Sequence, residues 1–294
     1  MHPKRLSLRR RESFRLFGAA AALAGCGNPA SAQNPAPTVR KGRIRQAVVR
    51  NILGKMPIDT FCRTLRSLGI AGVDFAPRNE WPVLRDHGLV ATLVAGAGHI
   101  RDGLNNTAKH AEFLKQFRQN IPAAADFGWK RVITMAGDRK GIRDTEGLTA
   151  CAAILREAVR IAADHDVTIC MELLNSKVDH PGYMCDSTAW GAALCDRVAS
   201  PHFKLLYDIY HMQIMEGDLI RTIREHITRI GHFHTAGNPG RRDLDSDQEL
   251  NYPAILRAIA ALQEEGKFDG YVTHEFSPKR GIESLRHAVE LCDV

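Results

Sequence analysis

The sequence of 294 residues has no long hydrophobic run, few aromatic residues and no cysteines at metal-finger or C-x-x-C spacing. No stretch approaches the roughly 18 apolar residues that a membrane-spanning helix needs. Aromatic residues make up 6% of the chain, while 44% of the residues are hydrophobic and 25% are charged. This balance excludes a collagen, a coiled coil and a disordered chain. The sequence therefore indicates a globular protein.

Apart from Cys26, the chain has six cysteines, none of them in a C-x-x-C pair or at metal-finger spacing. We expect them to be small core residues, and a single disulfide pair stays open on sequence alone. They are Cys62, Cys151, Cys170, Cys185, Cys195 and Cys292.

The net charge of +7 is concentrated at the start of the chain. Six Lys or Arg side chains lie within the first 25 residues beside a single acidic one, Glu12, which leaves only +2 for the rest. A basic groove for a phosphate backbone is not indicated. We expect no nucleic-acid partner.

Residues 1–26 have the pattern of an export signal, with a basic start followed by the apolar run 17–24 and then small residues. Arg10 and Arg11 resemble a twin-arginine signal. Residues 23–26 resemble a lipoprotein processing box that ends in an acylated Cys26. We therefore expect an exported protein that is either periplasmic or anchored in the membrane by a lipid on Cys26.

A second cleavage site competes with Cys26. Residues 30–32 read Ala-Ser-Ala and would place the cut near Gln33. Residues 27–40 are rich in Pro, Ala, Ser and Asn and predict a flexible linker.

From residue 41 to residue 294, eight short apolar runs alternate with stretches of helical period such as Leu148–Asp164. Eight predicted strands that alternate with helices predict an α/β fold, a single-domain (β/α)8 TIM barrel. An open doubly wound sheet would carry a Gly-rich phosphate loop after its first strand, and none is there. The predicted strands are Ile44–Val49, Gly72–Ala76, Val90–Ala95, Arg131–Ala136, Val167–Leu173, Phe203–Ile209, Ile230–Thr235 and Tyr271–Phe276.

Four consecutive predicted strands end in a side chain that can bind a metal: Glu172, Asp208, His234 and Glu275. In a barrel, the C-terminal strand ends form the active-site face. Three carboxylates in one cavity repel each other unless a cation lies between them. We therefore predict one divalent metal ion, and the oxygen-rich set suits Mn²⁺, Mg²⁺ or Co²⁺ better than a structural Zn²⁺.

Longer motifs surround these four residues. They are Met171–Asn175, Tyr207–Asp218, Gly231–His234 with Asn238–Arg241, Asn251–Pro253 and His274–Phe276. Together they resemble the hydroxypyruvate isomerase-like branch of the xylose isomerase-like TIM barrels, a group of sugar isomerases and epimerases. The resemblance covers residues 43–280 and is densest from residue 165 onward.

The resemblance implies that the four residues hold the metal and that Glu172 and Glu275 also act as the acid/base pair. Removal of a proton from an α-hydroxy carbonyl compound gives an enediolate, and return of the proton at the neighbouring carbon completes an aldose–ketose isomerisation. The resemblance further implies that His211 and Arg241 bind the substrate.

For three further side chains, two histidines and one asparagine, the sequence predicts a role less specifically. His99, after the third strand, could line the pocket or be an ordinary loop histidine. Asn175 is placed with the substrate-binding residues and could hold the loop after Glu172. His232 is expected to point to the face opposite His234 and to pack in the core.

Two departures from the patterns of related enzymes leave the identity of the substrate open. Hydroxypyruvate isomerases commonly have glutamine where His234 stands, and ketose epimerases carry a further glutamate where this chain has Val178. The first hypothesis is an isomerase or epimerase of a small hydroxy-carbonyl compound or sugar. The alternatives are a lyase or dehydratase of the same barrel and a non-catalytic sugar-binding lipoprotein. An endonuclease would need a three-zinc cluster with more histidines, and a homo-oligomer is compatible with the resemblance.

Overall fold

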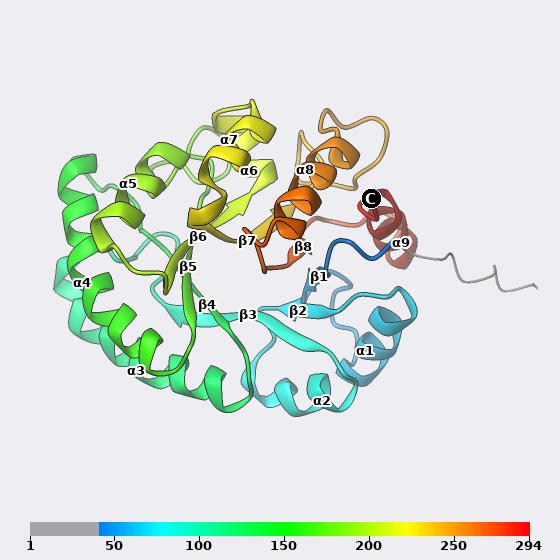
Figure 1. Cartoon of the computed structure of the whole chain (residues 1–294), viewed down its shortest axis with the longest axis horizontal. Helices are drawn as coiled ribbons and strands as arrows, with labels where there is room; N and C mark the ends of the chain where they lie inside the picture. The colour runs from blue at the N-terminus through cyan, green and yellow to red at the C-terminus, as the bar shows by residue number, and fades with distance from the viewer. Residues whose placement is uncertain (1–40) are drawn as a thin grey trace, which may run out of the picture. The chain divides into compact units, whose positions relative to one another are not determined.

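The computed structural model describes residues 41–294, so the predicted export signal (1–26) and linker (27–40) lie outside the described residues. In the described part, eight parallel strands close into a barrel in sequence order (Figure 1). The predicted TIM barrel and its eight strands are confirmed. The strands are β1 (Gln46–Val49), β2 (Gly72–Asp74), β3 (Val90–Ala97), β4 (Arg131–Thr134), β5 (Thr168–Glu172), β6 (Phe203–Asp208), β7 (Ile230–Thr235) and β8 (Val272–His274).

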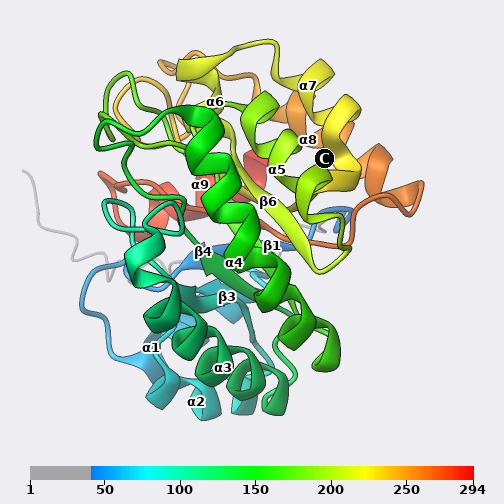
Figure 2. The same cartoon turned by 90° about the vertical axis from the view of Figure 1, so that its left-hand side faces the viewer.

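At least one helix follows each strand, and the helices lie around the outside of the barrel (Figures 1 and 2). The α-helices are α1 (Ile58–Ser67), α2 (Trp81–Asp86), α3 (His110–Asp126), α4 (Asp144–Asp164), α5 (Thr188–Val198), α6 (Ile209–Met215), α7 (Leu219–His226), α8 (Tyr252–Glu264) and α9 (Ile282–Leu291). Short 3₁₀ turns occur at Arg78–Glu80, Thr107–Lys109 and Ile227–Arg229. Within residues 41–294, no helix is long and apolar enough to cross a membrane.

Local sequence explains where several helices begin. Ser187 precedes α5, and its hydroxyl accepts a hydrogen bond from the backbone N–H of Trp190. Asn251 caps α8 in the same way through the N–H of Ala254, and Pro253 fits the first turn because it needs no N–H partner there. These caps fix the ends of the helices that follow β5 and β7.

The hydrophobic residues form a large outer core between the strands and helices and a small core inside the barrel. Leu93, Cys170 and Leu206 fill the inner core and are fully buried. Burying each such leucine contributes about 2 kcal/mol to folding. All six cysteines of the described residues are buried and free, which confirms their prediction as core residues and excludes a disulfide among them.

Side chains from β5 to β8 fill the barrel in layers, because every second residue of a strand points inward. His232 and His234 are two residues apart and therefore share the inner face. The expectation that His232 points away from His234 was wrong: their rings lie 5.5 Å apart inside the barrel. The residues two positions before the four predicted metal ligands are fully buried: Cys170, Leu206, His232 and Thr273.

Candidate metal centre and active site

The ends of β5, β6, β7 and β8 bring the four predicted metal ligands together. One ligand atom from each of Glu172, Asp208, His234 and Glu275 lies within 4.8 Å of the others. Glu172, Asp208 and His234 are buried, while the side chain of Glu275 is 27% exposed. The cluster is thus open to the barrel mouth on the side of Glu275.

His234 is the centre of this cluster. Its Nδ1 atom lies 2.7 Å from Glu275 Oε2, 3.3 Å from Glu172 Oε1 and 3.9 Å from Asp208 Oδ2. Nδ1 is buried and makes no hydrogen bond of acceptable geometry within residues 41–294. On the other side of the ring, Nε2 lies 3.0 Å from Asp74 Oδ2.

These contacts require positive charge between His234 and the carboxylates. Although burial alone would lower the pKa of His234, the charge of Glu275, the hydrogen bond to Asp74 and the close approach of the Glu172 carboxylate raise it well above its usual value. A proton on Nδ1 or a divalent cation would meet this need. Three carboxylates and one imidazole nitrogen are a donor set that suits Mn²⁺, Mg²⁺ or Co²⁺. The residues present therefore fit the metal that the sequence predicts.

The two glutamates have opposite pKa directions. Burial raises the pKa of Glu172 above its ordinary value. Burial would also raise the pKa of Glu275, but the charges of His234 and Arg241 hold it below its ordinary value. Two carboxyl groups with separated pKa values are the arrangement that an acid/base pair needs.

Arg241 comes from the loop after β7 and reaches the cluster. Its Nη2 atom donates to Asp208 Oδ2 at 3.0 Å and to Glu275 Oε2 at 2.7 Å, and its Nη1 atom touches His211 Nε2. The backbone of Arg241 is left-handed, with φ of 49°, and Gly240 precedes it with φ of 91°. Arg241 and a metal ion would therefore compete for Asp208 and Glu275.

His211 lies on α6, and Asn175 fixes which of its nitrogens carries the proton. Oδ1 of Asn175 accepts from the backbone N–H groups of Val178 and Asp179 at 3.0 and 2.8 Å. This bonding sets the orientation of the amide, so that Nδ2 donates to Asp179 and, at 2.6 Å, to Nδ1 of His211. A neutral imidazole has one acceptor nitrogen, so Nε2 carries the hydrogen and faces the cavity as a donor.

Burial keeps this imidazole neutral. Burial lowers the pKa of His211 to about 4, although the charge of Asp208 opposes the shift. Because Nδ1 already accepts from Asn175, the contact of Arg241 Nη1 with Nε2 joins two donors. Arg241 has a long, flexible side chain, so it can move off Nε2 and leave His211 to donate to a substrate oxygen.

Two of the cavities at the barrel mouth lie beside the cluster and share a wall. The first, about 320 Å³, is lined by Glu172, His211, Arg241 and Glu275. The second, about 430 Å³, has an apolar wall of Phe75, Ala95, Ile133 and Met135. The two share Ile100, and we call the second one the apolar chamber.

The remaining predicted residues lie around these cavities. His99 is exposed and lines the apolar chamber, not the first cavity. Asn175 is fully buried behind His211, so it holds the imidazole and does not face a substrate. The prediction that Asn175 holds the loop after Glu172 agrees with its bonds to Val178 and Asp179.

Asp74 is the site residue that sequence reasoning missed. It ends β2, is fully buried and contacts His234, a predicted metal ligand on β7. The available signal was a carboxylate inside an otherwise apolar predicted strand, Gly72–Ala76.

Comparison with known proteins places this chain in a family. A sequence model for the xylose isomerase-like TIM barrel matches residues 81–292, and the chain belongs to this family. It is 32% identical over 177 residues to the 2-oxo-tetronate isomerase of Cupriavidus necator, matching 59% of this chain and 65% of that protein. It is 30% identical over 175 residues to the hydroxypyruvate isomerase of Escherichia coli, matching 58% of this chain and 66% of that protein.

Both matches span less than two thirds of the relative's own length. They confirm the resemblance to the hydroxypyruvate isomerase-like branch. A crystal structure described as an AP endonuclease, family 2, from Brucella melitensis has a TM-score of 0.73 and 25% identity to this chain. That match covers 82% of this chain and 96% of the other.

Proposed function

We propose that this protein is an isomerase or epimerase of a small hydroxy-carbonyl compound or sugar and that it depends on one divalent metal ion. The observation that carries the proposal is the pair Glu172 and Glu275, which flank Asp208 and His234 within one cluster of ligand atoms. A protein that only binds a sugar has no need for two acid/base groups at this position.

The proposed mechanism is proton transfer through an enediolate. Glu172, Asp208, His234 and Glu275 would hold a divalent ion, which polarises the substrate carbonyl and adjacent hydroxyl and so acidifies the neighbouring C–H bond. One of the two glutamates takes this proton. The carboxyl group of the other returns a proton at the neighbouring carbon or on the opposite face.

His211 and Arg241 would orient the substrate during this transfer. The Nε2–H group of His211 donates to a substrate oxygen and stabilises the negative charge that develops there. The planar guanidinium of Arg241 matches a carboxylate or a pair of oxygens. The two isomerases described above act, by their names, on oxo-acids, which supports a substrate that carries a carboxylate.

The apolar chamber supports a substrate that is longer than three carbons. Its walls offer aliphatic and aromatic contacts beside the cluster, and Ala95 is exposed although it lies on β3. The carbon skeleton of a four-carbon acid or a larger sugar derivative could pack there while its hydroxy-carbonyl end lies at the glutamates.

Deuterium exchange tests the reaction. The purified chain, loaded with Mg²⁺, is incubated in D₂O with hydroxypyruvate, tartronate semialdehyde, 2-oxo-tetronate or a ketose and followed by proton NMR. We expect metal-dependent deuterium at carbon and a rearranged product, both absent in Glu275→Gln. A chain that exchanges no proton with any of these compounds contradicts the proposed isomerase.

The same experiment separates the alternatives. A lyase or dehydratase of this barrel would release a β-substituent and give an unsaturated product in place of an isomer. A non-catalytic sugar-binding lipoprotein would bind a ligand with equal affinity in the wild type and in Glu275→Gln and would turn over nothing.

We also propose that the chain is exported. The support is the sequence pattern of residues 1–26, which lie outside the described residues. In the native host, we expect the protein in the membrane fraction if Cys26 carries a lipid, and release into the soluble periplasmic fraction in Cys26→Ser. Retention of the wild-type chain in the cytoplasm contradicts export.

A further inference from the structure

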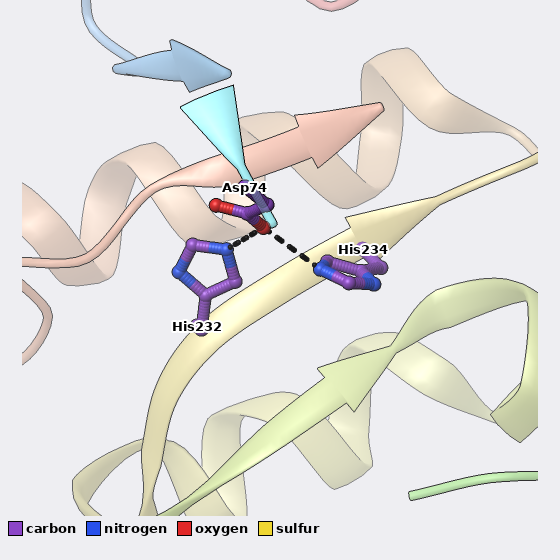
Figure 3. Close-up of side chains that lie close together, drawn as sticks. All are labelled: Asp74, His232 and His234. Carbon is purple, nitrogen blue, oxygen red and sulfur yellow. Dashed lines mark hydrogen bonds and ion pairs between the residues drawn. The ribbon is translucent and has the colours of Figure 1, made fainter. Parts of the chain in front are cut away.

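A second cluster of titratable side chains shares His234 with the candidate metal ligands. It consists of Asp74, His232 and His234 (Figure 3). All three are fully buried. Nε2 of His232 lies 2.7 Å from Asp74 Oδ2, and Nε2 of His234 lies 3.0 Å from the same oxygen. A carboxylate on β2 is thus shared by two histidines of β7.

The carboxylate of Asp74 determines where both imidazoles carry hydrogen. Oδ2 of Asp74 lies within hydrogen-bond distance of Nε2 of both histidines, and Oδ1 accepts from the hydroxyl of Thr92. A carboxylate accepts hydrogen bonds from such groups. Each histidine therefore donates from Nε2, and Nδ1 of His234 is the nitrogen that faces Glu172, Asp208 and Glu275.

Other contacts hold Asp74 in this position. The hydroxyl of Thr92, on the neighbouring strand β3, donates to the second carboxylate oxygen, Oδ1. The pairing of β2 with β3 shifts register between Val73 and Asp74, a local irregularity of the kind that redirects side chains near active sites.

The residue after Asp74 shows the same local distortion. Phe75 has a left-handed backbone with φ of 62°, which is unfavourable for a bulky residue, and its ring packs edge-on against His234. The strained backbone at Phe75 places the side chains of both Asp74 and Phe75 against His234.

We propose that Asp74 is a positioning residue of the metal centre: it holds His234 in the tautomer and ring orientation that present Nδ1 to the metal. A carboxylate that accepts the second N–H of a metal-bound histidine orients the ring and increases its basicity as a ligand. Asp74 touches neither metal nor substrate in this arrangement. It acts through His234.

The inference rests on the metal in the proposed function, and the experiment separates the two. The full chain is titrated with Mn²⁺, and free Mn²⁺ is measured by electron paramagnetic resonance for the wild type, Asp74→Asn and His232→Asn. A wild type that binds no divalent metal contradicts the proposed function. A wild type that binds Mn²⁺ lets the variants test Asp74 alone.

We expect Asp74→Asn to weaken Mn²⁺ binding about 10- to 100-fold. His232→Asn is the matched control, because His232 is equally buried and bonded to the same oxygen but provides no ligand atom to the four-residue cluster. Its Kd should stay within about threefold of the wild type, since His232 reaches the metal centre only through Asp74 and through the edge of the His234 ring. Equal Kd values for Asp74→Asn and the wild type overturn the proposal.

A measurement on the wild type covers the case in which Asp74→Asn fails to fold. In the Mg²⁺-loaded chain, the ¹⁵N chemical shifts of the His234 ring should show hydrogen on Nε2 and none on Nδ1. The opposite tautomer overturns the proposal. Binding of two Mn²⁺ ions per chain, with one lost in His232→Asn, also overturns it, because Asp74, His232 and His234 would then be ligands of a second metal.

Discussion

The side-chain amide of Asn175 donates to Nδ1 of His211 across 2.6 Å and so turns the Nε2–H group of that imidazole toward the cavity. The two residues lie on different βα units, and backbone N–H groups after Asn175 keep its amide from rotating. The donor that would meet the substrate is therefore set by a residue that the substrate does not reach.

Asn175→Asp should reverse the tautomer of His211. A carboxylate accepts from Nδ1–H, so Nε2 becomes an acceptor and can no longer donate to a substrate oxygen. We expect kcat/KM to fall about 100-fold, the scale of losing one donor to a developing oxyanion. The affinity for Mn²⁺ should change little, because the side-chain amide of Asn175 donates to Asp179 and His211 and not to the metal ligands. Unchanged kcat/KM would contradict the role given to Asn175.

Arg241→Ala should affect metal binding and catalysis in opposite directions. Arg241 pairs with Asp208 and Glu275, so its removal takes a positive charge away from two metal ligands. We expect Mn²⁺ to bind several-fold more tightly, while kcat/KM falls about 100-fold because the substrate loses its charged partner. Arg242→Ala is the control, since Arg242 pairs with Asp247 outside the cluster. Weaker Mn²⁺ binding in Arg241→Ala would contradict this account.

The stability of the metal-free chain should depend on His211 at acid pH. Because burial lowers the pKa of His211 to about 4, the unfolded chain binds a proton there at a higher pH than the folded chain does. The neutral imidazole contributes fully to the free energy of unfolding above pH about 6.5. This contribution is lost progressively as pH falls from there through about 4, which lowers the free energy of unfolding by roughly 3 kcal/mol. Urea unfolding in EDTA at several pH values should show a steeper loss of stability for the wild type than for His211→Gln. Parallel curves would contradict a neutral buried imidazole.

Ala95→Phe should distinguish substrates by length. The new ring would occupy the apolar chamber, which Ala95 lines. We expect kcat/KM for a six-carbon ketose to fall at least about 10-fold, the effect of losing roughly 1.4 kcal/mol of binding. Hydroxypyruvate is the control within the same variant, because three carbons fit the first cavity. An equal loss for both substrates would show that the chamber does not select by length.

The eight strands could be predicted because buried parallel strands are short, β-branched and bounded by helical patterns. The cluster of candidate metal ligands could be predicted because Glu172, Asp208 and His234 lie at the ends of such strands. The contact between Asn175 and His211 could not be predicted, since it depends on how the loop after β5 folds back onto α6. The orientation of His232 follows from strand alternation and was wrongly assigned. Asp74 lies in the middle of the predicted strand Gly72–Ala76, and only the structure shows that β2 ends at this residue.

The two carboxylate oxygens of Asp208 have different partners. Oδ1 accepts from the backbone N–H groups of Tyr210 and His211 at the start of α6, while Oδ2 faces the metal ligands. One carboxylate thus ends a strand, caps a helix and belongs to the cluster of candidate metal ligands. The amide protons of Tyr210 and His211 should exchange with solvent faster when the metal is removed, because Asp208 then loses one of its anchors. Occupancy of the metal centre would in this way be coupled to the order of the helix that presents His211.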